Sequence, residues 1–349
     1  MIQHLEAYNN DIDDALDMLD PEMFRHAGIF LTGVTGMIVS TVADVLLRWN
    51  EAEHLEMKLY FAGRSQERVQ ARFPAYTAGT DYRYVFYDAL LPLPDDLPHI
   101  DFLVHGASNA DPAHFATEPV ETMLANIDGL HRLLWAAKRV KAQRVLYLSS
   151  GEVYGNRTSE QPFCERDYGD IDILNPRACY PSAKRAAETL CAAFTQEYGM
   201  ETVIARPCHI YGPSITASDS RASAQFTRAA ARHEDIVLKS DGQTLRSYCY
   251  TLDCATAIIT LLQKGKCGEA YNIATQKPVT IRQLAEAFAK VSGTELRFEN
   301  PSDRERKSYN LMHHSVLDVR KLKQLGWQER FSFPMGVTKT MEYFKNTNA

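Results

Sequence analysis

The stretch FLTGVTGMIVS, Phe30–Ser40, joins an apolar β-rich run to an amphipathic run through a turn that contains glycines. Gly33 and Gly36 can adopt the positive φ of a tight turn and let backbone N–H groups approach a pyrophosphate at a helix N-terminus. A third small residue usually follows and lets the helix pack close to the sheet, but here that position holds Val39. The context of strand, turn and helix still predicts a dinucleotide-binding loop.

Working outward from this loop, apolar runs alternate with helical patterns. The runs include GIFLTG, MKLYFAG, RYVFYD, DFLVHGAS and RVLYLSS, and the helical patterns include STVADVLLRWNEA and PVETMLANIDGLHRLLWAAKRV. This alternation predicts βαβ units, and therefore an α/β fold of the Rossmann type with a doubly wound parallel sheet. Beyond Tyr211 the alternation becomes less regular, which predicts a smaller C-terminal α/β lobe that binds the substrate.

These patterns divide the chain into three parts. We expect an N-terminal helical extension over residues 1–27, in which the acidic stretch DIDDALDMLDPEMF forms a short helix appended to the domain that follows. A dinucleotide-binding Rossmann domain is expected over residues 28–211. The substrate lobe is expected over residues 212–349, with some segments returning to the Rossmann domain.

Composition excludes several classes of function. The formal net charge of -6, with no cluster of Lys and Arg, argues against nucleic-acid binding. Seven cysteines form no C-x-x-C pair, so we expect reduced thiols and neither a disulfide framework nor a metal site. No apolar run reaches the ~18 residues that a membrane span requires, and the N-terminus is acidic where a signal peptide would be basic. These features predict a soluble cytoplasmic protein without a membrane partner.

The end of the second predicted strand, YFAGRS, bears on the choice of cofactor. An acidic residue there would bind the adenosine ribose hydroxyls of NAD, but Gly63 occupies the position. Arg64 and Ser65 follow it and suit a ribose 2′-phosphate, which favours NADP over NAD. A solvated surface arginine is the alternative for Arg64. Asp88, after the third strand, is placed to accept a hydrogen bond from the adenine amino group.

Two further stretches carry reactive groups. VLYLSSGEVYG, Val145–Gly155, places Ser150 and Glu152 at the end of a predicted buried strand, although serines that cap a turn and a solvated glutamate would give the same pattern. In YPSAK, Tyr180 and Lys184 are four residues apart at the head of a predicted helix and share one face. A nearby ammonium favours the phenolate, so we expect Lys184 to lower the pKa of Tyr180 and make it a general base.

At this point the chain resembles the extended short-chain dehydrogenases of the NAD-dependent epimerase/dehydratase type, which remodel nucleotide sugars. The resemblance runs from about Gly28 to Trp327, in family order, through TGVTG, HGAS, LANIDG, SSGEVYG, YPSAK, ARPCHIYGP, RSYCY and GEAYNIA. It implies that Tyr180 removes a proton from a sugar hydroxyl while a hydride passes to the nicotinamide. It also implies that Lys184 bonds the nicotinamide ribose, and that Ser150 aligns the hydroxyl.

The resemblance also implies the ligand contacts and a homodimer paired through two long helices. It places the cofactor against Gly33, Thr35, Gly36, Met37, Ile38, Arg64, Ser65, Asp88, Ala107, Ser108 and Lys184. It places the nucleotide sugar against Glu152, Arg206, His209, Arg221 and Arg246. A surface arginine at the start of a helix remains the alternative for Arg221.

These residues leave several reactions of the family open. The 4,6-dehydratases carry an aspartate where this chain has Gly151, and many 4-epimerases have a small apolar residue where it has Glu152. PRACY and Arg246 resemble the UDP-glucuronate decarboxylases most closely. Gly151 and His209 depart from that group, in which they are a serine and an asparagine. The alternatives are therefore a 4-epimerase, a 4,6-dehydratase, or an NADPH-dependent reductase of an activated keto-sugar or keto-polyol.

Overall fold

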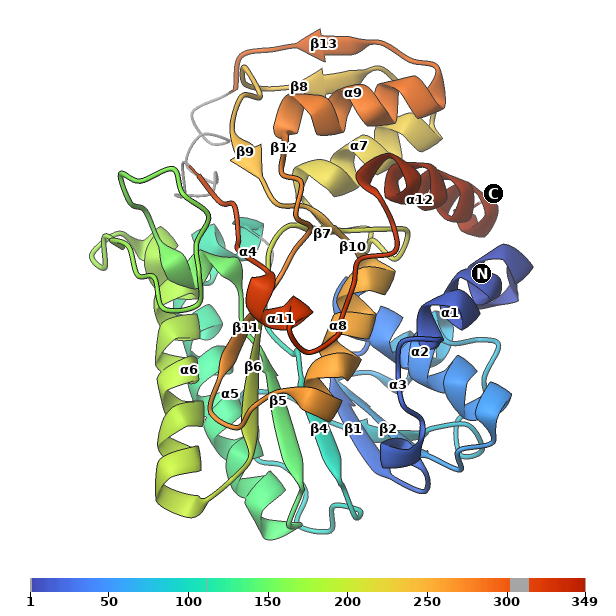
Figure 1. Ribbon diagram of the computed structural model, residues 1–349, viewed down its shortest axis with the longest axis vertical. Helices are drawn as coiled ribbons and strands as arrows, with labels where there is room; N and C mark the ends of the chain where they lie inside the picture. Colours follow the sequence, from blue (N-terminus) through green and yellow to red (C-terminus); the bar gives the residue numbers. More distant parts are fainter. Residues whose placement is uncertain (1, 111, 302–313, 349) are drawn as a thin grey trace.

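A seven-stranded parallel sheet forms the centre of the computed structural model, which describes residues 2–110, 112–301 and 314–348 (Figure 1). The strand order is β11-β6-β5-β4-β1-β2-β3, and every neighbouring pair is parallel. The bounds are β1 Gly28–Thr32, β2 Lys58–Gly63, β3 Arg83–Phe86, β4 Phe102–His105, β5 Arg144–Leu148, β6 Thr202–Pro207 and β11 Ala270–Ile273. The predicted doubly wound Rossmann fold is confirmed.

Helices cover both faces of this sheet. One face carries α2 (Met37–Glu53) and α8 (Thr251–Lys264), which pack together, and the other carries α5 (Pro119–Arg139) and α6 (Cys179–Tyr198). Alternate residues of β1 therefore belong to different hydrophobic clusters, with Ile29 and Leu31 in one and Phe30 in the other. A strand buried on both faces needs an apolar side chain at nearly every position, which explains the continuous run GIFLT.

The second half of the chain contributes to both the sheet and a separate layer. In the sheet β11 pairs with β6, and α8 packs on the face of the sheet. The separate layer lies above the sheet in Figure 1. Its elements are α7 Ala222–Ala231, α9 Ile281–Ser292, α12 Phe333–Asn348, β8 Ile236–Leu238, β13 Leu296–Phe298, β9 Leu245–Arg246 and β12 Val279–Thr280. The short β7 Ile210–Tyr211 and β10 Cys249–Tyr250 pair where this layer meets the sheet, and α11 is Arg320–Lys323. The division at residue 212 stays a prediction.

The N-terminal segment is more integrated than the sequence suggested. Its helix α1 is Glu6–Leu16, which begins before the predicted stretch, and Tyr8 and Ile12 are buried in the main hydrophobic cluster. The Tyr8 hydroxyl donates to Asp44 of α2 at 3.0 Å. The helix α1 also meets α12, where Lys339 pairs with Asp11 at 3.0 Å. The prediction of an appendage was wrong because the apolar face of α1 completes the core.

Two short helices lie in the first half of the chain. α3 (Gln66–Arg72) follows β2, and α4 (Pro112–Thr117) precedes α5.

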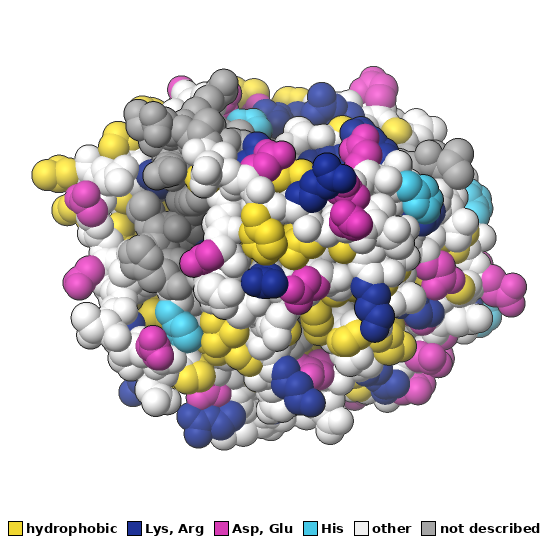
Figure 2. All heavy atoms as spheres, turned by 90° about the horizontal axis from the view of Figure 1, so that it is seen from above, with side chains coloured by type: hydrophobic (Ala, Val, Ile, Leu, Met, Phe, Trp, Pro, Cys, Tyr) yellow, Lys and Arg dark blue, Asp and Glu magenta, His cyan; other side chains and the backbone are white. Residues whose placement is uncertain are grey.

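All seven cysteines are free thiols. Within the described ranges, no helix is long and apolar enough to cross a membrane. On the face shown in Figure 2, Lys and Arg side chains are interspersed with Asp and Glu.

Val39 is tolerated at the third position of the dinucleotide loop because Gly106 lies opposite. A Cβ atom built on Gly106 would fall inside the contact distance of Val39 Cγ2, and it would also lie 3.2 Å from Leu148 Cδ2. A glycine at position 39 would allow close contact between helix and sheet. Here Gly106, on the opposite side of the contact, provides the same space. Sequence reasoning noted only the missing glycine.

We therefore expect Gly106→Ala to destabilise the protein by about 1–3 kcal/mol, the usual cost of overpacking a rigid contact. Val39→Ala, added to Gly106→Ala, should recover most of this loss because it removes the Cγ2 atom. Urea unfolding of both variants measures the effect. Gly63→Ala is the matched control, since its Cβ would make only an ordinary 3.7 Å contact with Val69. Additive effects of Val39→Ala and Gly106→Ala would contradict the coupling.

Candidate active site

A cavity of about 580 Å³ lies at the carboxyl ends of the sheet strands. This is where open parallel sheets bind their ligands. Its wall is built from the turn after β1, the ends of β2, β4 and β5, the head of α6 and the segment after β6. The predicted site residues that line it are Gly33, Thr35, Gly36, Met37, Ile38, Arg64, Asp88, Ala107, Ser108, Ser150, Glu152, Tyr180, Lys184, His209 and Arg221.

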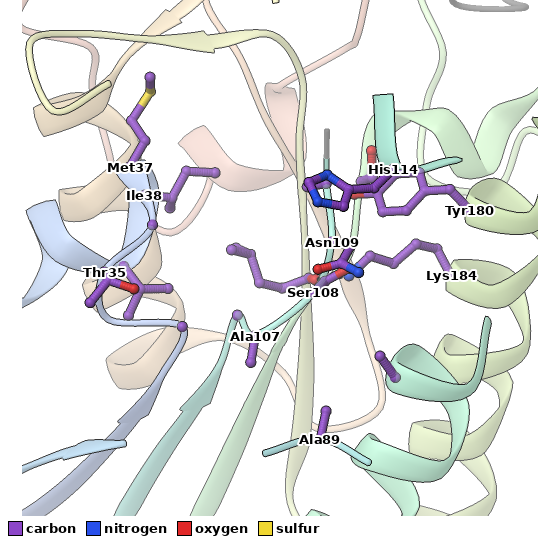
Figure 3. Close-up of a pocket in the computed structure, with 18 of the residues that line it drawn as sticks. Thr35, Met37, Ile38, Ala89, Ala107, Ser108, Asn109, His114, Tyr180 and Lys184 are labelled. Atoms are coloured by element: carbon purple, nitrogen blue, oxygen red, sulfur yellow. Dashed lines mark hydrogen bonds between the residues drawn. The ribbon is translucent and has the colours of Figure 1, made fainter. Parts of the chain in front are cut away.

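The turn between β1 and α2 forms a cradle of backbone atoms. Gly33 has a φ of 75°, and a Cβ there would lie 2.7 Å from the backbone nitrogen of Ala107. Gly36 is the N-cap residue of α2 and has no side chain to bond the first N–H groups of the helix. Figure 3 shows Thr35, Met37 and Ile38 on this side of the cavity, across from Tyr180 and Lys184. Such a helix terminus suits a phosphate group.

Tyr180 lies at the head of α6 with its ring stacked on Phe115, at 4.5 Å between centroids. It is 6% exposed and hydrogen-bonds with Ser150. Burial raises the pKa of Tyr180, the charge of Glu152 raises it further, and the Ser150 hydrogen bond opposes both effects. Lys184 was expected to lower the pKa of Tyr180. In the protein without cofactor this pKa is raised instead, because burial of the phenolate has the largest effect. Phe115 was missed, since it lies 65 residues before Tyr180 in an unremarkable segment.

Lys184 lies one helical turn after Tyr180 and is 2% exposed. Its Nζ donates to the carbonyl oxygen of Leu148 at 2.7 Å and lies 5.6 Å from the centre of the Tyr180 ring. In Figure 3 it extends from α6 toward Ser108 and Asn109. Burial lowers the pKa of Lys184 to about 7, while the carboxylate of Glu188 acts in the opposite direction. The ammonium can therefore lose its proton near neutral pH.

Glu152 is paired with a residue that sequence reasoning did not select. Arg177 donates to its two carboxylate oxygens at 3.2 and 3.4 Å, and the guanidinium of Arg177 is 4.6 Å from the centre of the Phe115 ring. Arg177 is 6% exposed. Arg177 belongs to the stretch PRACY, three residues before Tyr180, which indicated only a family resemblance. We infer that Glu152 enters the cavity as one half of an ion pair.

His209 and Arg246 form a second polar group. Ser315 Oγ lies 2.7 Å from His209 Nε2, and Arg246 Nη1 lies 3.1 Å from the same nitrogen and 2.8 Å from Ser315 Oγ. His209 lines the cavity, whereas Arg246 does not. Burial, and then the charge of Arg246, lower the pKa of His209 well below its usual value, so the ring is neutral. The predicted direct contact of Arg246 with substrate does not fit this placement, because Arg246 lies outside the cavity and contacts His209, which lines it.

The structure also explains the glycine at position 151. A Cβ there would lie 3.2 Å from both Cβ and Sγ of Cys208. That distance is tighter than ordinary packing, so an aspartate or serine at position 151 requires Cys208 to shift. The residue at position 151, in the stretch Val145–Gly155, is therefore limited in size by a residue 57 positions away in the sequence.

Besides Arg246, two more predicted contacts lie away from the cavity. Arg206 is buried behind it, with its guanidinium bonded to both oxygens of Glu188, to the Tyr154 hydroxyl and to the Glu165 carbonyl. The predicted contact of Arg206 with substrate does not fit this placement, because Arg206 does not line the cavity and four of its five N–H donors have these acceptors. Ser65 caps α3 by accepting from the Arg68 backbone N–H and donates to Glu67, so its hydroxyl has other partners.

The remaining predicted residues differ in how they are held. Arg221, at the start of α7, donates to both carboxylate oxygens of Asp219, and both residues line the cavity. Asp88 accepts from the Leu90 backbone N–H at 2.9 Å. Arg64 is exposed at the rim of the cavity. Among the described residues, no three His, Cys, Asp or Glu side chains are grouped so that they could hold a metal ion.

Comparison with known proteins agrees with this geometry. The model of the NAD dependent epimerase/dehydratase family matches residues 29–274. UDP-glucuronic acid decarboxylase 3 of Arabidopsis thaliana is 30% identical over 323 residues, which cover 91% of this chain and 89% of that protein. UDP-glucuronic acid decarboxylase 1 of Xenopus tropicalis is 28% identical over 322 residues, covering 91% and 72%.

Solved structures share the fold. The UDP-glucose 4-epimerase of Thermotoga maritima, solved with UDP-glucose, has a TM-score of 0.77 at 24% identity and covers 92% of this chain and 100% of that one. A dTDP-glucose 4,6-dehydratase double mutant from Streptomyces venezuelae, solved with NAD, has a TM-score of 0.77 at 23% identity, covering 91% and 96%. At such identities the similarity is evidence for the fold alone.

Proposed function

Because this chain belongs to the NAD-dependent epimerase/dehydratase family, we propose that it decarboxylates a UDP-linked hexuronic acid through a keto-sugar intermediate. The observation that carries the proposal is that Tyr180 and Lys184 lie together across the cavity from the glycine turn (Figure 3), with Ser150 hydrogen-bonded to Tyr180. The decarboxylase relatives, which align with about nine tenths of the chain, favour this reaction within the family.

The chain's own residues account for the proton transfers. Tyr180 takes the proton of the sugar C4 hydroxyl, Ser150 aligns that hydroxyl, and Lys184 bonds the nicotinamide ribose. A nicotinamide cofactor held by the glycine turn and Lys184 would supply the hydride acceptor for C4, and its positive charge would favour the Tyr180 phenolate. The fit of the glycine cradle and of the uncapped start of α2 to a pyrophosphate supports this cofactor.

The loss of carbon dioxide follows from the ketone. A 4-keto-hexuronate is a β-keto acid, so the C5–C6 bond breaks, its electron pair moves to the ketone oxygen as an enolate, and carbon dioxide leaves. A proton from solvent at C5, the hydride returned to C4 and the Tyr180 proton returned to the C4 oxygen would then yield a pentose, with no net change in the oxidation state of the cofactor. Glu152 lines the cavity and is paired with the buried Arg177, so its carboxylate is held in a fixed position from which it would orient the sugar ring.

Incubation of the protein with UDP-glucuronate and NAD⁺ tests this function. We expect carbon dioxide and a UDP-pentose in equal amounts, with Tyr180→Phe as the negative control. Interconversion of two UDP-sugars without carbon dioxide would establish an epimerase instead. Loss of water from a nucleotide hexose would establish a 4,6-dehydratase, which Gly151 disfavours because it offers no acid.

A reductase is the second candidate because of Arg64. Gly63 stands where an acid would select NAD, and Arg64 lines the cavity beside it. Stoichiometric consumption of NADPH by a keto-sugar, with no pentose formed from UDP-glucuronate, would favour this function. A reductase releases its dinucleotide in each turnover, whereas a decarboxylase retains it.

The proposed preference for NADP rests on Arg64, since Ser65 is engaged with α3. We expect Arg64→Ala to weaken NADP binding by about 1.5–3 kcal/mol, as for a hydrogen bond to a charged group, and to leave NAD binding nearly unchanged. Calorimetric titration with both dinucleotides measures this. Arg68→Ala, on the exposed side of α3, is the matched control. Equal losses for the two dinucleotides, or tighter binding of NAD by the unmodified protein, would contradict the preference.

We also propose a cytoplasmic homodimer paired through α5 and α6. Apolar side chains are exposed on α5, namely Val120 at 61%, Met123 at 37%, Leu124 at 42% and Trp135 at 41%. Free thiols fit a reducing compartment. Sedimentation analysis tests the dimer, and a monomer at micromolar concentration would contradict it. Cell fractionation tests the location.

A further inference from the structure

The end of β5 is tied to α6 by three consecutive residues. The carbonyl oxygen of Leu148 accepts from Lys184, the Ser149 hydroxyl donates to Glu188 at 2.5 Å, and Ser150 hydrogen-bonds with Tyr180. The three partners on α6 are spaced by four residues and so lie along one face of the helix. Two of them belong to the proposed catalytic group, and the third, Glu188, has no role in the proposed reaction.

Glu188 is itself held firmly. Arg206 donates through Nε to Oε1 at 2.9 Å and through Nη2 to Oε2 at 2.5 Å, which is a bidentate pair. The side chains are 3% and 11% exposed for Arg206 and Glu188. Arg206 is anchored in turn by the Tyr154 hydroxyl, at 3.0 Å, and by the Glu165 carbonyl. A bidentate pair fixes direction as well as distance, so the carboxylate offers Ser149 an acceptor in a fixed place.

On the basis of the proposed function, we propose that Glu188 is a positioning residue that fixes Ser149, and through it Ser150, while its charge, one helical turn after Lys184, favours the ammonium form of that side chain. Ser150 directly follows Ser149, so a rotation of the strand end would move the catalytic hydroxyl. A misplacement of about 1 Å in such a group can cost about a hundredfold in rate.

The charges around Lys184 give Glu188 its electrostatic part. The titratable neighbours are Glu188, Cys191 and Tyr180 of α6, Tyr147 of β5 and His105 of β4. Burial raises the pKa of Cys191, Tyr147 and Tyr180, and it lowers the pKa of His105 to about 3. These four are therefore neutral near pH 7. Glu188 supports the pKa of Lys184 against the effect of burial.

Glu188→Gln tests the proposal, because the amide keeps the shape and an acceptor oxygen but removes the charge. We expect kcat to fall roughly ten- to hundredfold, with the KM for the nucleotide sugar nearly unchanged. The pH at which NAD⁺ binding weakens, as Lys184 loses its proton, should move down by about one unit. Glu201→Gln is the matched control, since Glu201 pairs with Arg144 at the other end of the sheet.

Ser149→Ala separates the two parts of the proposal without disturbing the Arg206–Glu188 pair. It should lower kcat but leave the pH midpoint of NAD⁺ binding in place, because Ser149 carries no charge. This variant also serves if Glu188→Gln unfolds. Unchanged kcat in Ser149→Ala would overturn the positioning of the strand end. An unshifted midpoint in folded Glu188→Gln would overturn the electrostatic part.

The outcomes distinguish this inference from the proposed function. If the unmodified protein turns over none of the nucleotide sugars, the proposed function fails. The midpoint of NAD⁺ binding in Glu188→Gln still tests the effect on Lys184 in that case. If the unmodified protein is active and both variants match it in kcat and midpoint, only the role of Glu188 fails.

Discussion

Replacing Tyr180 with Phe is expected to lower turnover by two or more orders of magnitude while the fold and NAD⁺ affinity are retained. The substitution removes one hydroxyl from a ring that is stacked on Phe115, so packing changes little. It removes the group proposed to take the sugar proton, and general bases contribute about 10²- to 10⁴-fold. Steady-state kinetics with UDP-glucuronate, or with the sugar identified as the substrate, measure the loss.

Tyr198→Phe is the control for this variant, because Tyr198 ends the same helix and lies outside the cavity. Near-normal turnover in Tyr180→Phe would overturn the catalytic assignment. A low turnover accompanied by lost NAD⁺ binding would instead indicate a disrupted cavity, so the affinity is measured in parallel.

Replacing Lys184 with Ala is expected to reduce turnover by a similar factor and, in addition, to weaken NAD⁺ binding. The variant loses the proposed ribose contact, the charge near Tyr180 and the bond to the Leu148 carbonyl. Calorimetric titration of NAD⁺ and steady-state kinetics measure the two effects. Lys58→Ala, at an exposed position at the start of β2, is the control. Unchanged NAD⁺ affinity would show that Lys184 does not contact the cofactor.

Lys184 also has a stability signature that requires no substrate. Its pKa falls from 10.5 in the unfolded chain to about 7 in the folded protein. Between these values the unfolded chain binds more protons, so the contribution of Lys184 to the free energy of unfolding rises with pH from about 7 to 10.5. Comparison of unfolding curves for the unmodified protein and Lys184→Ala across this window should reveal the difference in slope. Parallel curves would indicate that Lys184 keeps an ordinary pKa.

Much of the fold and part of the site could be predicted from local patterns. GIFLT is apolar throughout because β1 is buried on both faces, and the glycine turn after it follows from its place between a strand and a helix. Tyr180 and Lys184 share a face because they are four residues apart on one helix. Such relations depend on spacing along the chain, so they can be recognised before the chain is folded.

Relations across the chain required the tertiary structure. Arg206 was predicted to bind the substrate because the sequence does not reveal that it pairs with Glu188 of α6. Arg177 was passed over because its partner, Glu152, lies on a different element. Arg246 contacts His209 and Ser315 and does not line the cavity. A buried charge pairs with whichever opposite or acceptor group the packing brings near, and no local pattern names that group.

The sequence by itself therefore determined the alternation of strands and helices along the chain, the dinucleotide turn and the Tyr180–Lys184 pair. Each of these depends on periodicity or short spacing within one or two adjacent elements. Only the tertiary structure decided how the third loop position could be Val39, through Gly106 on a neighbouring strand end, and why position 151 is glycine, through Cys208. These contacts depend on how closely elements distant in sequence approach. Close packing makes the identity of one residue depend on the volume of the other.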